Sequence, residues 1–274
     1  MYSSAFVAAV VESGGPSRVV SMDPAGESCP LTGSPERRTF HIESAHTPVR
    51  RHSANQLLRE RYAWRGYHGV KLPDDLSGSH FSLSATRDGQ TIGTMTVGFE
   101  NPHVLNCEEA FAEEVHQLRI SGRRLCEFTR LAVDPGVGTK AVLAALFHVA
   151  YIVAHRLRGV DTLLMEVNPR HVRYYERMLG ARVLGSERPN TKVNAPAVLL
   201  CLEFAHVRSQ IEHFAGKPAG VSGERSLYPL AFTRQEEAGI IARLTEPQLA
   251  QQPDRPRPFV FRLPSWPKRV LAES

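Results

Sequence analysis

Two periods of hydrophobic and polar residues organise the chain between about residues 38 and 215. Residues 80–100 contain two runs in which apolar and polar positions alternate, separated by Asp88-Gly89. This pattern predicts a β-hairpin, because Asp-Gly suits the tight turn between two strands. Residues 47–65 repeat apolar positions every three or four residues, which predicts a helix whose buried face holds Ala54, Leu57, Leu58 and Tyr62 (or Arg61).

The rest of this region continues as alternating strands and helices. Further strands are predicted at residues 39–44, 125–133, 161–167 and 195–204, and further helices at residues 107–118, 139–157 and 169–179. The resulting order is β-α-β-β-α-β-α-β-α-β. It predicts an α/β (α+β) fold, with a central mixed, mostly antiparallel sheet, one β-α-β crossover, and helices on both faces.

The two ends of the chain lack such patterns. Residues 1–37 are rich in Ser, Gly and Pro, so we expect a flexible N-terminal segment. Residues 38–215 form the predicted domain. Residues 216–274 form a C-terminal extension, with one helix at residues 233–244 followed by a Pro-rich tail.

Composition and charge exclude several classes of protein. The 274 residues are 42% hydrophobic and 22% charged, which is typical of a globular protein with a sizeable core. The net charge of +5 is too small for a nucleic-acid-binding protein but favours acidic partners. No apolar run reaches the roughly 18 residues of a transmembrane segment. The four cysteines have no CxxC spacing, so they indicate free thiols, no metal site and a cytoplasmic location.

Two charged residues interrupt the apolar strand at residues 125–133. Glu127 and Arg130 lie three residues apart, so on a regular strand their side chains leave opposite faces. Burial of either charge is costly unless the charge is paired or used. Spacing alone leaves two interpretations open, which are ion pairs with groups elsewhere and a role in catalysis.

The second half of the domain resembles the GNAT acyltransferases. The stretch VNPRHVRYYERMLGARV at residues 167–183 matches a strand that ends in Asn, followed by a helix that carries a Tyr and ends at Leu-Gly. The turn VDPGVGTKA at residues 133–141 keeps the two glycines of the GNAT phosphate-binding turn, but Val133 replaces its basic residue. This replacement argues against acyl-coenzyme A as the donor.

Three motifs extend the resemblance to the N-acyl amino acid synthases of the N-acyltyrosine synthase type. They are ExTRLAVDP at residues 127–135, VNPRHxxYY at residues 167–175 and NAPAVLLxL at residues 194–202. That family is GNAT-like and is related to the acyl-homoserine lactone synthases. The resemblance implies an N-acyltransferase that moves a long-chain fatty acyl group from acyl carrier protein to the amine of an amino acid.

The resemblance also implies roles for individual residues. Glu127 is the candidate general base and Arg130 is either the clamp for the substrate carboxylate or part of the scaffold. Tyr175 is the candidate proton donor to the leaving thiolate, although aromatic packing also explains it. The other candidates are substrate-binding Arg61, Tyr62, Asn168 and His171, and Gly138, Thr139 and Lys140 for the phosphate of the acyl donor. No bound cofactor and no metal are expected.

Two alternatives remain open at this stage. An acyl-homoserine lactone synthase would use a sulfonium-containing co-substrate and release a lactone. A catalytically silent acyl-binding protein would keep the fold without the reaction. Structural explanations also exist for Asn168, which ends a strand and caps the next helix, and for His171, which lies on a helical first turn.

Overall fold

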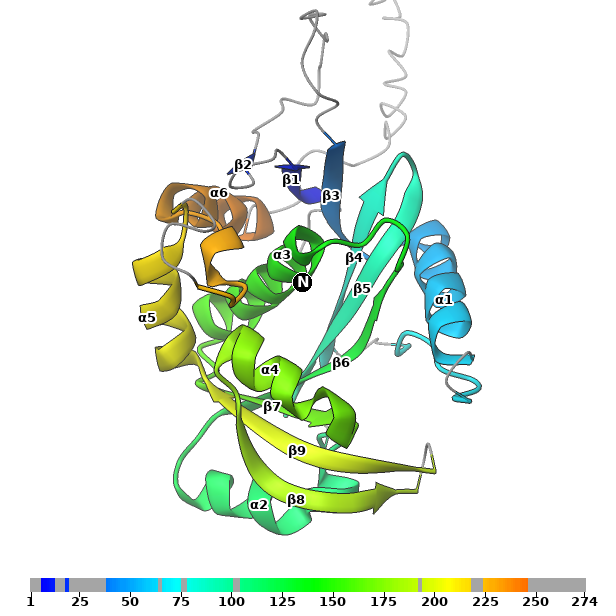
Figure 1. Ribbon diagram of the computed structural model, residues 1–274, viewed down its shortest axis with the longest axis vertical. Helices are drawn as coiled ribbons and strands as arrows, with labels where there is room; N and C mark the ends of the chain where they lie inside the picture. Colours follow the sequence, from blue (N-terminus) through cyan, green and yellow to red (C-terminus); the bar gives the residue numbers. More distant parts are fainter. Residues whose placement is uncertain are drawn as a thin grey trace, which may run out of the picture.

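The computed structural model describes residues 6–12, 18–19, 38–63, 66–74, 78–100, 104–191, 194–217 and 224–245. These residues form one nine-stranded sheet in the order β2-β1-β3-β4-β5-β6-β7-β9-β8 (Figure 1). Its strands are β1 (Phe6–Glu12), β2 (Arg18–Val19), β3 (Arg38–Ser44), β4 (His80–Arg87), β5 (Gln90–Phe99), β6 (Leu125–Val133), β7 (Thr162–Val167), β8 (Arg182–Asn190) and β9 (Ala195–Glu203).

The sheet is mixed and mostly antiparallel, as predicted. The pair of β6 and β7 is parallel, whereas every other pairing between the described strands is antiparallel. β4 and β5 form the predicted hairpin, with positive φ angles of 50° at Asp88 and 76° at Gly89. A two-residue turn of this kind follows the right-handed twist of the strands it joins.

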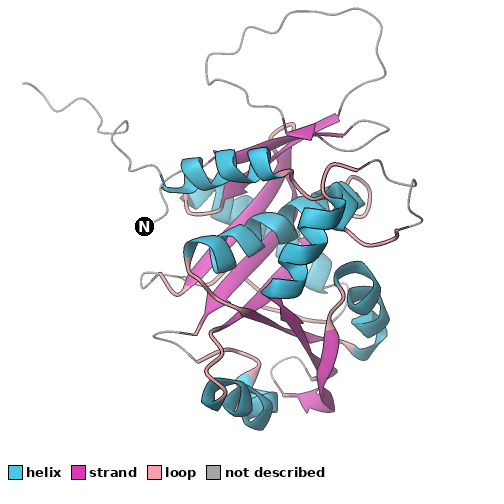
Figure 2. Cartoon of the chain, turned by 90° about the vertical axis from the view of Figure 1, so that its left-hand side faces the viewer, coloured by secondary structure: helices cyan, strands magenta, loops and turns pink. Residues whose placement is uncertain are grey.

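Helices cover both faces of the sheet. α1 (Pro48–Ala63) and α2 (Glu108–Ile120) pack on one face, where α1 buries the predicted Ala54, Leu57 and Leu58. The opposite face carries α3 (Lys140–Tyr151), α4 (Val172–Leu179), α5 (Phe204–Phe214) and α6 (Arg234–Thr245). Figure 2, seen from the side of α5 and α6, shows these helices lying across the strands.

α3 is the central helix of the larger core. Thr139 caps its N-terminus by accepting a hydrogen bond from the Val142 amide at 3.4 Å, and wider π-type turns continue it through Ile152–Leu157. α3 is apolar all round because the sheet covers one side and α5 and α6 cover the other. Among the described residues, Lys140–Leu157 is the one stretch long and apolar enough to cross a membrane, and most of it is buried in this core.

The prediction that regular structure begins only at residue 38 is wrong for residues 6–12 and for residues 18–19, which form β1 and β2. Residues 6–12 form β1, which pairs with β3 and buries Val7, Ala8 and Val10. β1 is a short apolar run, and its pairing with β3 joins residues at least 26 positions apart in the sequence, so local periodicity does not reveal it. The remaining residues of the predicted flexible segment lie outside the described part of the chain.

Part of the predicted C-terminal extension belongs to the main core. The backbone of this segment is fixed by Leu227 N–H, which donates to the Met178 carbonyl at 3.0 Å, and by Phe232 N–H, which donates to His148 Nδ1 at 2.9 Å. The predicted helix is present as α6, which buries Ile240 and Leu244. The Pro-rich tail at residues 246–274 lies outside the described residues.

Besides the strands before residue 38, two further elements were not predicted, β8 and α5. β8 is an edge strand with Gly185 and Pro189 inside it, and its register shifts twice against β9. Glycine, proline and charged residues are common on edge strands because they discourage pairing with other chains, but they hide the alternation that marks a strand. α5 follows β9 without a turn, so its apolar residues extend the apolar run of that strand.

We expect the C-terminal segment to contribute to stability. Ile240 is fully buried against the core, so Ile240→Ala should lower the free energy of unfolding by about 2–5 kcal/mol through lost burial and a residual cavity. Chemical denaturation of the full chain measures this change. Ala242→Ser, on the exposed side of the same helix, is the control, and equal stabilities of the two variants would contradict the packing of α6.

Candidate active site

The site forms where two neighbouring strands separate. β6 and β7 pair only from Leu125 to Glu127 and from Thr162 to Leu164, and both strands continue beyond these residues. The gap between them opens into a cleft of about 540 Å³. Residues of β6, β7, β9 and the segment after α1 line this cleft.

Glu127 is the last residue of β6 that pairs with β7. Its side chain is buried, with 3% of the residue exposed. Asn106 Nδ2 donates a hydrogen bond to Oε1, and the Cys107 amide donates to Oε2 at 3.3 Å. Gly98 of β5 pairs with Glu127, and a Cβ at this glycine would lie 3.0 Å from Glu127 Cγ. The carboxylate is therefore fixed in the cleft by two hydrogen bonds and by close packing against Gly98.

Burial makes Glu127 a stronger base than an ordinary glutamate. Loss of solvation raises its pKa, although the hydrogen bonds from Asn106 and Cys107 and the charge of Arg130 act in the opposite direction. The neighbouring Cys107 thiol also has a raised pKa, because it is buried and lies close to the charges of Glu127 and Glu166. Cys107 therefore remains a thiol at neutral pH.

A β-bulge brings Arg130 to the same cleft as Glu127. Thr96 pairs with Thr129 and Thr94 pairs with Ala132, so one residue of β5 faces two residues of β6. Arg130 adopts a positive φ of 52° within the bulge. The prediction that the two charged side chains leave opposite faces assumed a regular strand and is therefore wrong, since both line the cleft.

The bulge is held by hydrogen bonds on both sides. Thr94 Oγ1 donates to the Arg130 carbonyl at 2.9 Å, and Arg130 Nε donates to the Lys71 carbonyl at 2.6 Å. Burial lowers the pKa of Arg130, while the charge of Glu127 raises it. A left-handed arginine costs about 1–3 kcal/mol of backbone strain, which other contacts must offset. The guanidinium thus both supports the segment after α1 and borders the cleft.

Four more of the predicted residues line the cleft, namely Tyr62, Asn168, His171 and Tyr175. The Tyr62 hydroxyl donates to the Leu131 carbonyl at 3.4 Å, and the Tyr175 ring packs edge-on against Phe147 at 6.4 Å. Asn168 directly follows β7, and its Oδ1 accepts a hydrogen bond from the Arg170 amide at 3.3 Å. The packing role considered for Tyr175 and the capping role considered for Asn168 are thus both present, together with a place in the cleft.

The other four predicted residues lie outside the cleft lining. Arg61 is in the last turn of α1, Gly138 and Thr139 precede α3, and Lys140 is the first residue of α3. Gly138 is required there, because a Cβ would lie 1.9 Å from Val133 Cγ1. Its N–H donates to the Asp134 carbonyl at 2.6 Å. Gly138 therefore shapes this turn, and an anion at this position would have to contact Lys140 and the first turn of α3.

The sequence analysis missed several polar residues of the cleft. Glu166 on β7 accepts a hydrogen bond from Asn190 Nδ2 of β8, and Asn106 holds Glu127. Tyr67 also lines the cleft, with its ring 6.1 Å from that of Tyr62. The asparagines come from a loop and from the unpredicted β8, so no local pattern marks them. A charged residue in the apolar run TLLMEV was the available signal for Glu166.

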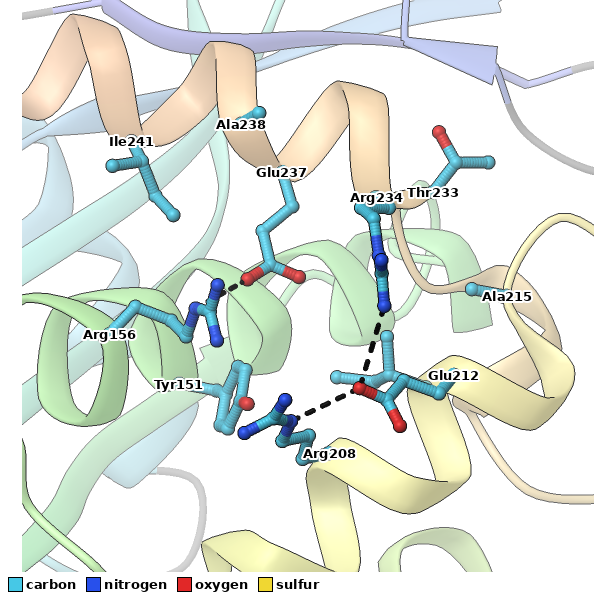
Figure 3. Close-up of a pocket in the computed structure, with 11 residues that line it drawn as sticks. Tyr151, Arg156, Arg208, Glu212, Ala215, Thr233, Arg234, Glu237, Ala238 and Ile241 are labelled. Carbon is cyan, nitrogen blue, oxygen red and sulfur yellow. Dashed lines mark hydrogen bonds and ion pairs between the residues drawn. The ribbon is translucent and has the colours of Figure 1, made fainter.

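Two other hollows border α3. A small apolar cavity of about 30 Å³ shares Phe128 and Phe147 with the cleft. A pocket of about 610 Å³ lies between α3, α5 and α6 (Figure 3). Its charged residues pair with one another, with Arg156 Nε 2.9 Å from Glu237 and Arg208 Nε 3.1 Å from Glu212. It contains none of the predicted site residues. Arg156–Glu237 joins the turns after α3 to α6, and Arg234–Glu212, at 3.8 Å, joins α6 to α5.

The described residues include no group of three or more His, Cys, Asp or Glu side chains that could hold a metal ion. Cys107, Cys126 and Cys201 are buried free thiols. The cleft brings together a buried carboxylate, a nearby guanidinium and tyrosine hydroxyls, beside Glu166 and His171.

The sheet is mixed, it splits at the one parallel pair among the described strands, and a buried carboxylate lies beside this split. The family model for the N-acyl amino acid synthase FeeM matches residues 53–203, which is more than half of the chain. The chain belongs to this family, and it is an N-acyltransferase, as the sequence analysis predicted. No curated protein sequence matches the chain.

Solved structures with a similar fold include FeeM, an N-acyl amino acid synthase from uncultured soil microbes. The TM-score is 0.54 at 24% sequence identity, over 62% of this chain and 93% of FeeM. An acyl-CoA N-acyltransferase from Pseudomonas aeruginosa has a TM-score of 0.44 at 16% sequence identity, over 60% of this chain and 98% of the other chain. The AHL synthase LasI has a TM-score of 0.43 at 14% sequence identity, over 61% of this chain and 90% of LasI.

Proposed function

We propose that this N-acyltransferase moves a long-chain fatty acyl group from acyl carrier protein to the amine of an amino acid, giving an N-acyl amino acid. The observation that carries the proposal is the buried Glu127 at the point where β6 and β7 diverge, inside a cleft of about 540 Å³. Family membership and the three sequence motifs also support it. The amino acid acceptor and the carrier-protein donor are parts of this proposal.

The reaction needs a neutral amine, whereas the α-amine of an amino acid is mostly protonated at pH 7. Glu127 takes one proton from the ammonium group, and the amine nitrogen then attacks the thioester carbonyl carbon. The carbon–sulfur bond breaks as the amide forms. Tyr175 is the proposed relay for the second amine proton: its hydroxyl gives a proton to the leaving thiolate and takes the amine proton in exchange. Backbone N–H groups at the split between β6 and β7 are the proposed donors to the oxyanion.

Arg130 is the proposed clamp for the acceptor carboxylate. Its guanidinium borders the cleft that also contains Glu127, and a planar fork of N–H groups suits a carboxylate. Tyr62, Asn168 and His171 line the same cleft and are the proposed contacts to the rest of the acceptor. Arg61 remains a candidate at the end of α1, outside the cleft lining.

The donor site has two proposed parts. Lys140 and the start of α3, after Gly138 and Thr139, would meet the single phosphate of a phosphopantetheine arm. Arg173 and Arg177 are exposed one turn apart on α4, close in sequence to the cleft residues Asn168 and His171. They offer positive charge to an acidic carrier protein. Such a donor also agrees with the cytoplasmic location expected from the cysteines.

The direct test is expression in a bacterial host followed by mass analysis of the organic extract. N-acyl amino acids that appear with the wild-type chain and disappear with Glu127→Gln would support the proposal. Extracts with no new acylated amine would contradict it, and acyl-homoserine lactones would indicate the neighbouring reaction instead.

Carrier-protein thioesters should outperform the matching acyl-coenzyme A at low salt. The reason is that long-range attraction between an acidic carrier protein and the basic surface speeds their encounter, and salt screens it over about 10 Å at 0.1 M ionic strength. Initial rates with the two donors at increasing salt concentration measure this preference, which should shrink as salt is added.

Charge reversal at Arg173 tests whether α4 is the docking surface for the carrier protein. Arg173→Glu should slow the carrier-protein reaction and leave the reaction with a short pantetheine thioester unchanged. Arg234→Glu makes the same change on α6, on the far side of α3, and is the matched control. An equal or higher rate with acyl-coenzyme A at low salt would overturn the carrier-protein assignment.

A further inference from the structure

The cleft contains a second carboxylate besides Glu127. Leu164 is the parallel partner of Glu127, and Glu166 lies two residues further along β7. Because side chains two apart on a strand share a face, Glu127 and Glu166 leave the same face of adjacent strands. The strands diverge at this point, so the two carboxylates border the space between them.

Each of these carboxylates is held by an asparagine from a different element. Asn106, before α2, donates to Glu127, and Asn190, at the end of β8, donates to Glu166. A neutral amide fixes the position of a carboxylate without cancelling its charge. The inner end of the cleft therefore combines two oriented acidic groups with a buried, uncharged Cys107 thiol.

This arrangement suits an organic cation better than a metal ion. The described residues supply no third ligand from another His, Cys, Asp or Glu. A primary ammonium group has three N–H donors, so it is able to contact two carboxylates that lie on either side of it.

We propose that Glu166 binds the ammonium group of the acceptor and holds it beside Glu127. Glu166 contacts the ammonium group before reaction, while Glu127 removes one of its protons, so the two carboxylates have different tasks. Asn190 acts as a positioning residue for Glu166. This inference rests on the proposed amine acceptor, and it assigns the ammonium site within the cleft.

The test separates binding from turnover. Glu166→Gln keeps the shape of the side chain and removes its charge, so KM for the amino acid should rise roughly 10- to 100-fold, which is the range for a hydrogen bond to a charged group. The value of kcat should fall less than it does in Glu127→Gln. Glu166→Asp keeps the charge and should recover part of the loss. Glu187→Gln, the same change at an exposed position of β8, should have no effect.

A binding measurement without any acyl donor makes the outcome independent of catalysis. The twenty protein amino acids are screened by calorimetry against the wild-type chain, and the best ligand is compared with its des-amino analogue. Wild type should prefer the amino acid, and Glu166→Gln should lose this preference. If no amino acid binds to wild type, the proposed acceptor fails as well. If wild type and a folded Glu166→Gln show the same preference, only the ammonium site is overturned.

Discussion

Replacing Glu127 with glutamine is expected to lower kcat by about 10²-fold or more, which is the usual contribution of a positioned general base. The amide retains the shape of the side chain and an oxygen that accepts a hydrogen bond, so the cleft should remain formed. Burial raises the pKa of Glu127, and removing a carboxylate that is costly to ionise should leave Tm unchanged or higher. Steady-state kinetics and thermal unfolding of both proteins measure the two effects.

The pH profile provides the control for this assignment. A base works in its ionised form, so the wild-type rate should fall as pH decreases through the pKa of Glu127. Since that pKa is raised, this decline should lie above the range of an ordinary glutamate, near 4.3. Glu127→Gln should lack the decline. Equal rates and equal pH profiles of the two proteins between pH 6 and 9 would exclude Glu127 as the base.

The sequence predicted the strand around Glu127 but not the geometry of its charges. A period of two places Glu127 and Arg130 on opposite faces, whereas the bulge opposite Met95 inserts one extra residue and redirects Arg130 into the cleft. A bulge depends on the register between β5 and β6, which are separated by α2 in the sequence. Local periodicity contains no information on this register, so the joint placement of the two charges required the structure.

The same limit explains which site residues were missed. Tyr62, Asn168 and Tyr175 belong to motifs and were identified from the sequence. Glu166 meets Asn190 only because β8 pairs with β9, which in turn pairs with β7. Family membership supports the reaction class, whereas the polar groups that surround the substrate come from pairings across the sheet.

Long acyl chains should be transferred far better than acetyl. The cavity behind Phe128 and Phe147 is lined on one side by Ala144 of α3 and on the other by Leu227 and Ala231 of the C-terminal segment. Each methylene buried there should stabilise binding by about 0.8 kcal/mol, so six of them correspond to roughly 10³-fold. Because the cavity measures only about 30 Å³, a chain must displace these side chains to enter. Competition between acetyl and dodecanoyl donors measures the preference.

Chain length should then depend on the space beside α3. Ala144→Leu fills the cavity and should shift the N-acyl products towards chains shorter by about the three carbons that the larger side chain adds. Ala238→Leu, in the pocket between α3, α5 and α6, adds the same volume outside the cavity and should leave the product distribution unchanged. A preference for acetyl would contradict the long-chain donor. Unchanged product lengths in a folded, active Ala144→Leu variant would show that the chain lies elsewhere, because a chain that reaches the cavity cannot avoid the added volume.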